Sequence, residues 1–214
     1  VFVSADSKTT YCVPSGACQT GVLRVLDGSS GQEIWSLEKA EASSKGFAGT
    51  SVAIGDVDGD KSVDVVALTG EGKVAVVNAK GQVTHLSTLS VDGSNTTSFG
   101  WGGGVALGDM DNDGWPEIAY GRAVFTMKNG SLQHLFTGNA SFGGQSTQSA
   151  LSYFIDLTGD GKLELVAGSS AYNVAGQTIW NSAATTDGYS AAGDFDQDGA
   201  PEIVLVRSGY LYIL

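Results

Sequence analysis

The sequence of 214 residues contains few of the residue types on which several protein classes depend. It has three prolines, two histidines and two cysteines, and its 11 basic residues stand against 23 acidic ones. The formal charge of −12 excludes a nucleic-acid-binding surface, because phosphate recognition needs clustered basic side chains. No apolar run reaches the length of about 18 residues that a membrane span requires, so we expect no such span.

Two features near the N-terminus bear on where the protein acts. The first residues, starting at Val1, contain neither the basic nor the apolar segment of a secretion signal, so we expect a processed or partial chain. Cys12 and Cys18 flank Pro14 and Gly16, which form turns that would bring the sulfur atoms together. We predict a disulfide bond, which would indicate an extracellular or periplasmic location. The alternative is a pair of free thiols in a reducing compartment.

Glycine is the abundant residue, with 31 copies, and hydrophobic residues make up 42% of the chain. This composition provides a core and many tight turns, and it argues against disorder. Apolar residues alternate over short runs and show no useful 3.6-residue period, which indicates strands and no helices. We therefore predict an all-β protein.

An internal repeat determines the expected architecture. Four acidic loops start at Asp56, Asp109, Asp156 and Asp194, at separations of 53, 47 and 38 residues, which is the range of propeller blades. A short alternating run enters each loop, an apolar run leaves it, and two further strands follow across Gly or Asn turns. This order predicts β-propeller blades of four antiparallel strands.

We treat residues 1–214 as a single β-propeller segment with three full and two partial blades. The predicted boundaries are 1–45 for a first partial blade, 46–92, 93–140 and 141–184 for full blades, and 185–214 for a last partial blade. The first blade lacks its first strand and the last blade lacks its last strand, so the two do not complement each other. Further blades, or other partners for the strand edges, are expected.

The acidic loops have the pattern of calcium sites. Carboxylates at alternate positions, with a glycine at the turn, converge several oxygen atoms on one hard cation, and a backbone carbonyl at position 7 would add another. Magnesium prefers more water, and the loops lack the soft ligands of zinc. The predicted ligands occupy positions 1, 3, 5 and 9 of each loop: Asp56, Asp58, Asp60, Asp64, Asp109, Asp111, Asp113, Glu117, Asp156, Thr158, Asp160, Glu164, Asp194, Asp196, Asp198 and Glu202.

An EF-hand is excluded on two grounds. Its bidentate glutamate belongs at position 12, where this chain has Ala67, Tyr120, Ala167 and Leu205. The segments on both sides of each loop are also strands, whereas an EF-hand loop joins two helices. The acid at position 9 instead places a side-chain ligand at the start of the outgoing strand.

These blades resemble FG-GAP/VCBS repeats, the calcium-binding blade family of integrin α-subunit propellers and many secreted bacterial proteins. Phe99-Gly100 and Gly102-Gly103-Gly104, before the Asp109 loop, resemble the segment for which the family is named. Phe142-Gly143-Gly144 is similar, whereas Phe47-Ala48-Gly49 departs from it. The resemblance implies a propeller with up to four bound Ca²⁺ ions and a role in extracellular recognition or scaffolding.

Two loops depart from the pattern, and we expect weaker calcium binding there. The Asp56 loop has its glycine at position 4 and Lys61 at position 6, so Lys61 is predicted to adopt a left-handed backbone conformation at a cost of about 1 kcal/mol. In the Asp156 loop the neutral Thr158 replaces a carboxylate. An Asx-rich turn without metal is the alternative for such loops.

A second resemblance concerns residues 21–35 and 175–180, which are similar to outer-strand hairpins of quinoprotein-type propellers. We interpret Trp35 and Trp180 as residues that pack between blades. His85 and His134 each occur alone, and we expect exposed strand residues there, not catalysts. No nucleophile elbow, Cys/His pair or phosphate loop is present.

We therefore expect an extracellular, secreted or cell-surface module that is not an enzyme. Calcium would rigidify its loops, and its partners would be a protein or glycan ligand or neighbouring copies of itself. Two alternatives stay open: the propeller of a secreted polysaccharide-acting enzyme of the rhamnogalacturonan lyase type, and a glycan-binding lectin.

Overall fold

The computed structural model describes residues 1–5, 21–94, 99, 102–144, 146, 149–182 and 187–214. Cys12 and Cys18 lie outside these residues, so the disulfide bond stays a prediction. No helix in the described part of the chain has the length and hydropathy that a membrane span needs.

The described residues form antiparallel sheets that fall into five groups of consecutive strands, named here blades 1 to 5. Blade 1 contains β1 (Phe2–Ala5), β2 (Gly21–Leu26) and β3 (Glu33–Leu37). Blade 2 contains β4 (Phe47–Gly55), β5 (Asp64–Thr69), β6 (Lys73–Val77) and β7 (Val83–Ser90). Blade 3 contains β8 (Val105–Gly108), β9 (Glu117–Tyr120), β10 (Ala123–Lys128) and β11 (Ser131–Thr137). Blade 4 contains β12 (Ser152–Ile155), β13 (Glu164–Ala167), β14 (Ser170–Tyr172) and β15 (Thr178–Asn181). Blade 5 contains β16 (Tyr189–Gly193), β17 (Glu202–Arg207) and β18 (Tyr210–Ile213).

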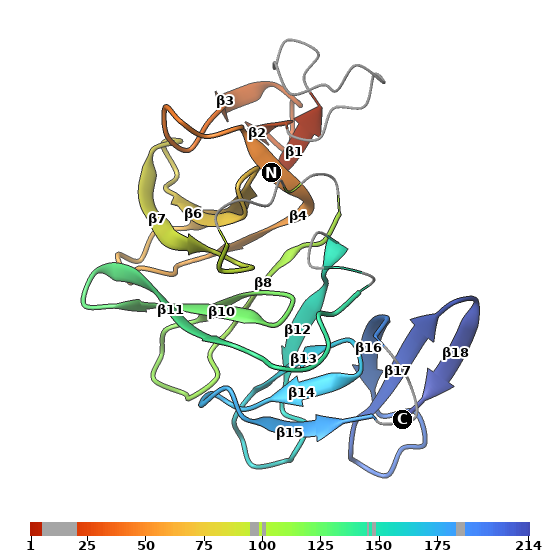
Figure 1. The fold of residues 1–214 in the computed structure, drawn as a ribbon. Coiled ribbons are helices and arrows are strands. Elements are labelled where there is room, and N and C mark those ends of the chain that lie inside the picture. The colour runs from red at the N-terminus through yellow and green to blue at the C-terminus, as the bar shows by residue number, and fades with distance from the viewer. Residues whose placement is uncertain (6–20, 95–98, 100–101, 145, 147–148, 183–186) are drawn as a thin grey trace.

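The first strands of successive blades lie next to one another, and the blades follow each other around them (Figure 1). Strand β4 contacts β8, β8 contacts β12, and β12 contacts β16. Ser51 of β4 forms an isolated parallel bridge with Gly104, which directly precedes β8, whereas pairing within each blade is antiparallel. A single residue pair, Gly21 with Phe47, also joins blades 1 and 2 into one seven-stranded sheet. The prediction of an all-β fold built from propeller blades is confirmed.

The hydrophobic core lies between blades. In β5 all six residues are buried, because alternate side chains point to opposite faces and both faces are covered. Val66 and Leu68 pack with Ile118 of blade 3, whereas Val65 and Ala67 belong to the cluster that contains Leu23 of blade 1. Each blade thus depends on its neighbours to bury its apolar residues.

Aromatic side chains of one blade cover the turn between the third and fourth strands of the next blade. The indole of Trp35 donates a hydrogen bond from Nε1 to the Ala79 carbonyl at 3.0 Å and lies against Gly81. Phe136 of blade 3 lies in the same way against Gly176 of blade 4. Trp180 packs in the cluster that contains Ile203 of blade 5. The interpretation of Trp35 as packing between blades is confirmed, and Trp180 packs against a cluster that blades 4 and 5 share.

The segments that lead into blades 3 and 4 contact residues that belong to neighbouring blades or lead into them. The ring of Phe99 lies against Gly72, and its amide donates to the Gly70 carbonyl at 2.9 Å. In blade 4, the amides of Phe142, Gly143 and Gly144 all donate to the carboxylate of Asp187, which precedes blade 5. The Phe-Gly segments recognised in the sequence therefore form contacts between blades.

The contact between Trp35 and Gly81 can be tested with alanine. Gly81 has φ +78°, and a Cβ there would approach the Trp35 ring to 2.9 Å. We expect Gly81→Ala to lower the free energy of unfolding by about 2–4 kcal/mol, since left-handed strain adds to overpacking. Gly31→Ala is the matched control: its φ is +71° but no atom lies within 4 Å of the added carbon. Urea denaturation should give a loss of about 1 kcal/mol for Gly31→Ala. Equal losses for the two variants would contradict the packing role of Trp35.

Candidate metal centres

The aspartate at position 1 organises the backbone of each loop. In the first loop, Asp56 accepts hydrogen bonds from the amide of Gly59 at 2.7 Å and from the amide of Lys61 at 3.0 Å. The three other aspartates at this position, Asp109, Asp156 and Asp194, also accept from the amide of position 6, but their second donor is the amide of position 5. All four loops therefore share the hydrogen bond from the amide of position 6 to the aspartate at position 1.

Two residues of every loop adopt the left-handed region, at positions 4 and 6. Position 6 is Lys61 in the first loop, with φ +67°, and glycine in the other three. The predicted conformation of Lys61 is confirmed. Position 4 also requires positive φ, which the sequence analysis missed: Asn112 has φ +60° and Gln197 has φ +66°, and the remaining two residues there are Gly59 and Gly159. Positions with a left-handed backbone usually carry Gly or Asn, so the glutamine at position 197 gives no indication of this conformation.

The acid at position 9 lies beneath each loop, at the start of the second strand of its blade. Asp64, Glu117 and Glu164 are buried, and Glu202 is partly buried. Each carboxylate accepts a hydrogen bond from the amide at position 2, as Glu117 does from Met110 at 2.9 Å and Glu202 does from Phe195 at 2.8 Å. Glu117 also accepts from the Thr126 hydroxyl at 3.0 Å, a partner that the sequence analysis did not identify.

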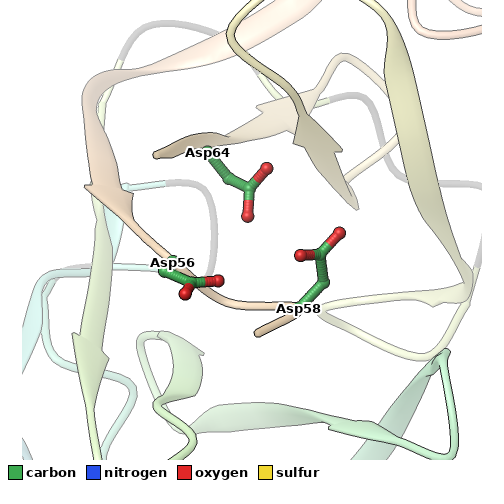
Figure 2. Close-up of side chains that lie close together, drawn as sticks. All are labelled: Asp56, Asp58 and Asp64. Carbon is green, nitrogen blue, oxygen red and sulfur yellow. The ribbon is translucent and has the colours of Figure 1, made fainter. Parts of the chain in front are cut away.

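In three loops the carboxylates at positions 1, 3 and 9 come together. Their nearest oxygen atoms lie within 4.8 Å of one another. Figure 2 shows this arrangement for Asp56, Asp58 and Asp64, whose carboxylates face one another. Calcium binds oxygen at about 2.3–2.6 Å, so two ligands of one ion lie at most about 5.2 Å apart. The geometry of these groups therefore fits a calcium ion. The other two groups are Asp109, Asp111 and Glu117, and Asp194, Asp196 and Glu202.

The predicted ligands at position 5 do not belong to these groups of three. Each accepts a hydrogen bond from the amide two residues later, as Asp113 does from Trp115 at 2.8 Å. The Asp156 loop differs because Thr158 supplies no carboxylate, but its Asp156 and Glu164 make the same backbone contacts as their equivalents. A ligand role for position 5, and for Thr158, stays a prediction.

The electrostatics of the loops favour a bound cation. Burial raises the pKa of Asp64, and the nearby carboxylates of Asp58, Asp60 and Asp56 raise it further. Burial also raises the pKa of Glu117, and Asp111 and Asp113 add to that effect. Among the described residues, no basic side chain forms an ion pair with a loop carboxylate; the two ion pairs found there join Arg24 to Glu33 and Lys73 to Glu41. A divalent cation would remove this repulsion.

The two histidines do not join any acidic group in the described part of the chain. His85 contacts the hydroxyl of Thr84, and His134 contacts the hydroxyl of Thr137 and packs edge-on against Phe125. His134 is exposed, as expected from the sequence, whereas His85 is partly buried. The acidic loops, and not the histidines, therefore provide the arrangement that can bind and hold a cation.

The strain at position 6 of the first loop can be measured by comparing Lys61→Gly with Lys61→Ala. Both variants remove the same charge, but only glycine relieves the left-handed backbone. We expect the Gly variant to be more stable than the Ala variant by about 1 kcal/mol in thermal or urea unfolding. The same comparison at Gln197 should give a similar difference, because its φ of +66° matches the +67° of Lys61. No difference at either position would show that the loop is not held in this conformation.

The raised pKa of Glu117 predicts that the effect of Glu117→Gln on the unfolding temperature changes sign when calcium is added. Because the folded carboxyl binds its proton more tightly than the unfolded one, its contribution to stability is full below the ordinary value of 4.5 and is lost as the pH rises through the raised pKa. In a chelator at about pH 7, we therefore expect Glu117→Gln to unfold at a higher temperature than wild type, with the advantage shrinking toward about pH 4. In excess calcium the order should reverse, since glutamine lacks the charge that binds the ion. A variant that is less stable in both buffers would contradict this account.

Comparison with known proteins supports the repeat and the fold. Residues 56–120 match the family described as FG-GAP-like repeat. This segment begins at the Asp56 loop and includes the Asp109 loop, so it covers two of the three carboxylate groups. No curated protein sequence matches the chain.

Solved structures with a similar fold have low sequence identity to the chain. The biofilm matrix protein Bap1 of V. cholerae is 23% identical, with a TM-score of 0.66 over 97% of this chain. Two rhamnogalacturonan lyases, YesW and the PL11 enzyme of Bacillus licheniformis, are 17% and 14% identical over 94% of this chain, with TM-scores of 0.62 and 0.64. The chain spans 31% of the matrix protein and 42% of each lyase. The chain therefore carries an FG-GAP-like repeat within a run of β-propeller blades.

Proposed function

We propose that this chain is a calcium-stabilised propeller module of an extracellular protein and that it acts in adhesion, recognition or structural assembly. Calcium rigidifies the loops, and the blades present surfaces to a protein or glycan ligand or to neighbouring copies of the chain. In this proposal the module itself is not an enzyme.

The repeated geometry of the loops carries the proposal. Three separate loops place carboxylates at positions 1, 3 and 9 within 4.8 Å of one another, and the fourth has the same backbone hydrogen bonds. A single acidic cluster is common on protein surfaces, but four loops that all bond position 6 to position 1 and position 2 to position 9 are difficult to explain by chance. The position 9 acids are also buried or partly buried without a basic partner, which is costly unless a cation compensates for the charge.

The choice of calcium follows from the ligand chemistry. Calcium accepts six to eight oxygen ligands in flexible arrangements, which suits crowded carboxylates. Calcium dependence also supports an extracellular location, because free calcium is scarce in the cytosol. Lyases and a matrix protein share the fold, so the fold by itself does not separate the enzymatic alternative from the structural one.

Removal of calcium should lower the melting temperature. Calcium at about 100 times its dissociation constant stabilises the folded state by about 2.7 kcal/mol per site, which corresponds to about 5–10 °C in a chain of this size. We expect this loss on adding a chelator, measured by calorimetry, and a smaller effect of magnesium at equal concentration. The variant Asp109→Asn should reduce the calcium effect. Glu38→Gln removes a charge from an exposed residue outside the loops and should leave the calcium effect unchanged.

Two further measurements decide between the structural role and its alternatives. Cleavage of rhamnogalacturonan by the purified chain would contradict the non-enzymatic role, and specific binding on a glycan array would identify a lectin. A melting temperature that is the same in calcium and in chelator would refute the calcium proposal itself.

A further inference from the structure

The Asp109 loop contacts the loop on each side of it. Trp115, at position 7, lies against Gly59 of the Asp56 loop, where a Cβ would approach the indole to 1.8 Å. On the other side Asn112, at position 4, donates a hydrogen bond from its amide nitrogen to the Gly161 carbonyl of the Asp156 loop at 2.6 Å. These two contacts join three loops from three blades into one continuous array.

Each contact is made to a glycine of the neighbouring loop whose amide donates a hydrogen bond to the aspartate at position 1 of that loop. The amide of Gly59 donates to Asp56 at 2.7 Å, and the amide of Gly161 donates to Asp156 at 2.9 Å. Within the described residues, the Asp194 loop has no such link. Its hydrogen bonds stay inside the loop, and no atom lies within 4 Å of the position that a Cβ at Gly199 would occupy.

Asn112 and Trp115 both lie next to the expected calcium ligands of their own loop. Asn112 lies between the carboxylates of Asp111 and Asp113, and the backbone carbonyl of Trp115 occupies the position expected to bind calcium. An ion that orders this loop therefore also fixes the indole on Gly59 and the amide on Gly161. The neighbouring loops then lose less conformational entropy when they bind their own ions.

We propose that the Asp56, Asp109 and Asp156 loops bind calcium as a coupled set, with Trp115 and Asn112 as positioning residues that transmit the coupling. Binding at the Asp109 loop increases the affinity of each neighbour, and by thermodynamic reciprocity each neighbour increases the affinity of the Asp109 loop. The Asp194 loop binds independently. This inference rests on the proposed calcium binding and adds a cooperative relation between the sites.

Two backgrounds of the full chain isolate the two links. In the first, Asp156→Asn and Asp194→Asn disable two loops and leave the Asp56 and Asp109 loops. Calorimetric titration with calcium should show the second ion binding at least about 5-fold more tightly than its loop would alone. Trp115→Ala should abolish this enhancement; alanine is already present at the same position of the Asp194 loop, as Ala200. Asn112→Gly should leave it unchanged, because Asn112 contacts the disabled loop.

The second background reverses the roles. Asp56→Asn and Asp194→Asn leave the Asp109 and Asp156 loops, where Asn112→Gly should abolish the enhancement and Trp115→Ala should preserve it. Gln197→Gly, in the otherwise wild-type chain, shows what relief of the same left-handed backbone does to calcium affinity by itself, since Gln197 has φ +66° and Asn112 +60°.

A second pair of variants tests the Trp115 contact from the opposite side. Gly59→Ala places a methyl group where the indole lies and should remove the enhancement in the first background. Gly159→Ala is its control in the wild-type chain, with φ +73° against +75° and no atom within 4 Å. Calcium binding with an enhancement that survives Trp115→Ala and Gly59→Ala would overturn the coupling alone. The absence of calcium binding in the wild-type chain would overturn the proposed function as well.

Discussion

The structure depends on the hydrogen bond that the acid at position 9 accepts from the amide at position 2. This bond joins the start of the second strand to the loop that follows the first strand. It also directs the position 2 side chain into the core shared with the next blade: Val57 packs among residues of blade 3, and Met110 packs with Tyr172 of blade 4. Phe195, in blade 5, makes the same hydrogen bond but is 57% exposed, because no blade packs on that face in this structure. One carboxylate therefore links the candidate ion to the packing between blades.

The charge of the loops opposes this arrangement. In three of the loops the position 9 acid is held close to two or three other carboxylates, and no basic side chain in the described residues pairs with them. Backbone amides supply part of the compensation, since the position 1 aspartates accept two or three hydrogen bonds each. Amide dipoles do not cancel a net charge, however. The packing between blades and the charge of the loops are thus coupled, and a cation that neutralises the loops also stabilises the core.

Much of the fold was predictable from the sequence because the same signals recur in each unit. Alternating apolar residues indicated the strands, and the acids at fixed spacing located the loops and the buried ligand at position 9. Contacts between blades were harder to predict from the sequence. Nothing in the sequence around Asp187 shows that its carboxylate accepts the amides of residues 142–144, and nothing around Trp115 indicates that its ring lies on Gly59. Such contacts depend on how blades are placed in space, whereas periodicity within one blade reports only on that blade.

The ranking of the four loops changes when backbone conformation is considered. The sequence ranked the Asp56 loop low because Lys61 stands at position 6, but positions 4 and 6 both require left-handed backbone. In the Asp56 loop, Gly59 adopts this conformation without strain and Lys61 adopts it with strain. In the Asp194 loop, Gly199 adopts it without strain and Gln197 adopts it with strain. The two are therefore equally strained. The Asp156 loop has glycine at both positions, so an unstrained backbone offsets its lack of a carboxylate at position 3. We therefore expect ligand charge and backbone strain together, and not the count of carboxylates alone, to determine how well each loop would hold an ion.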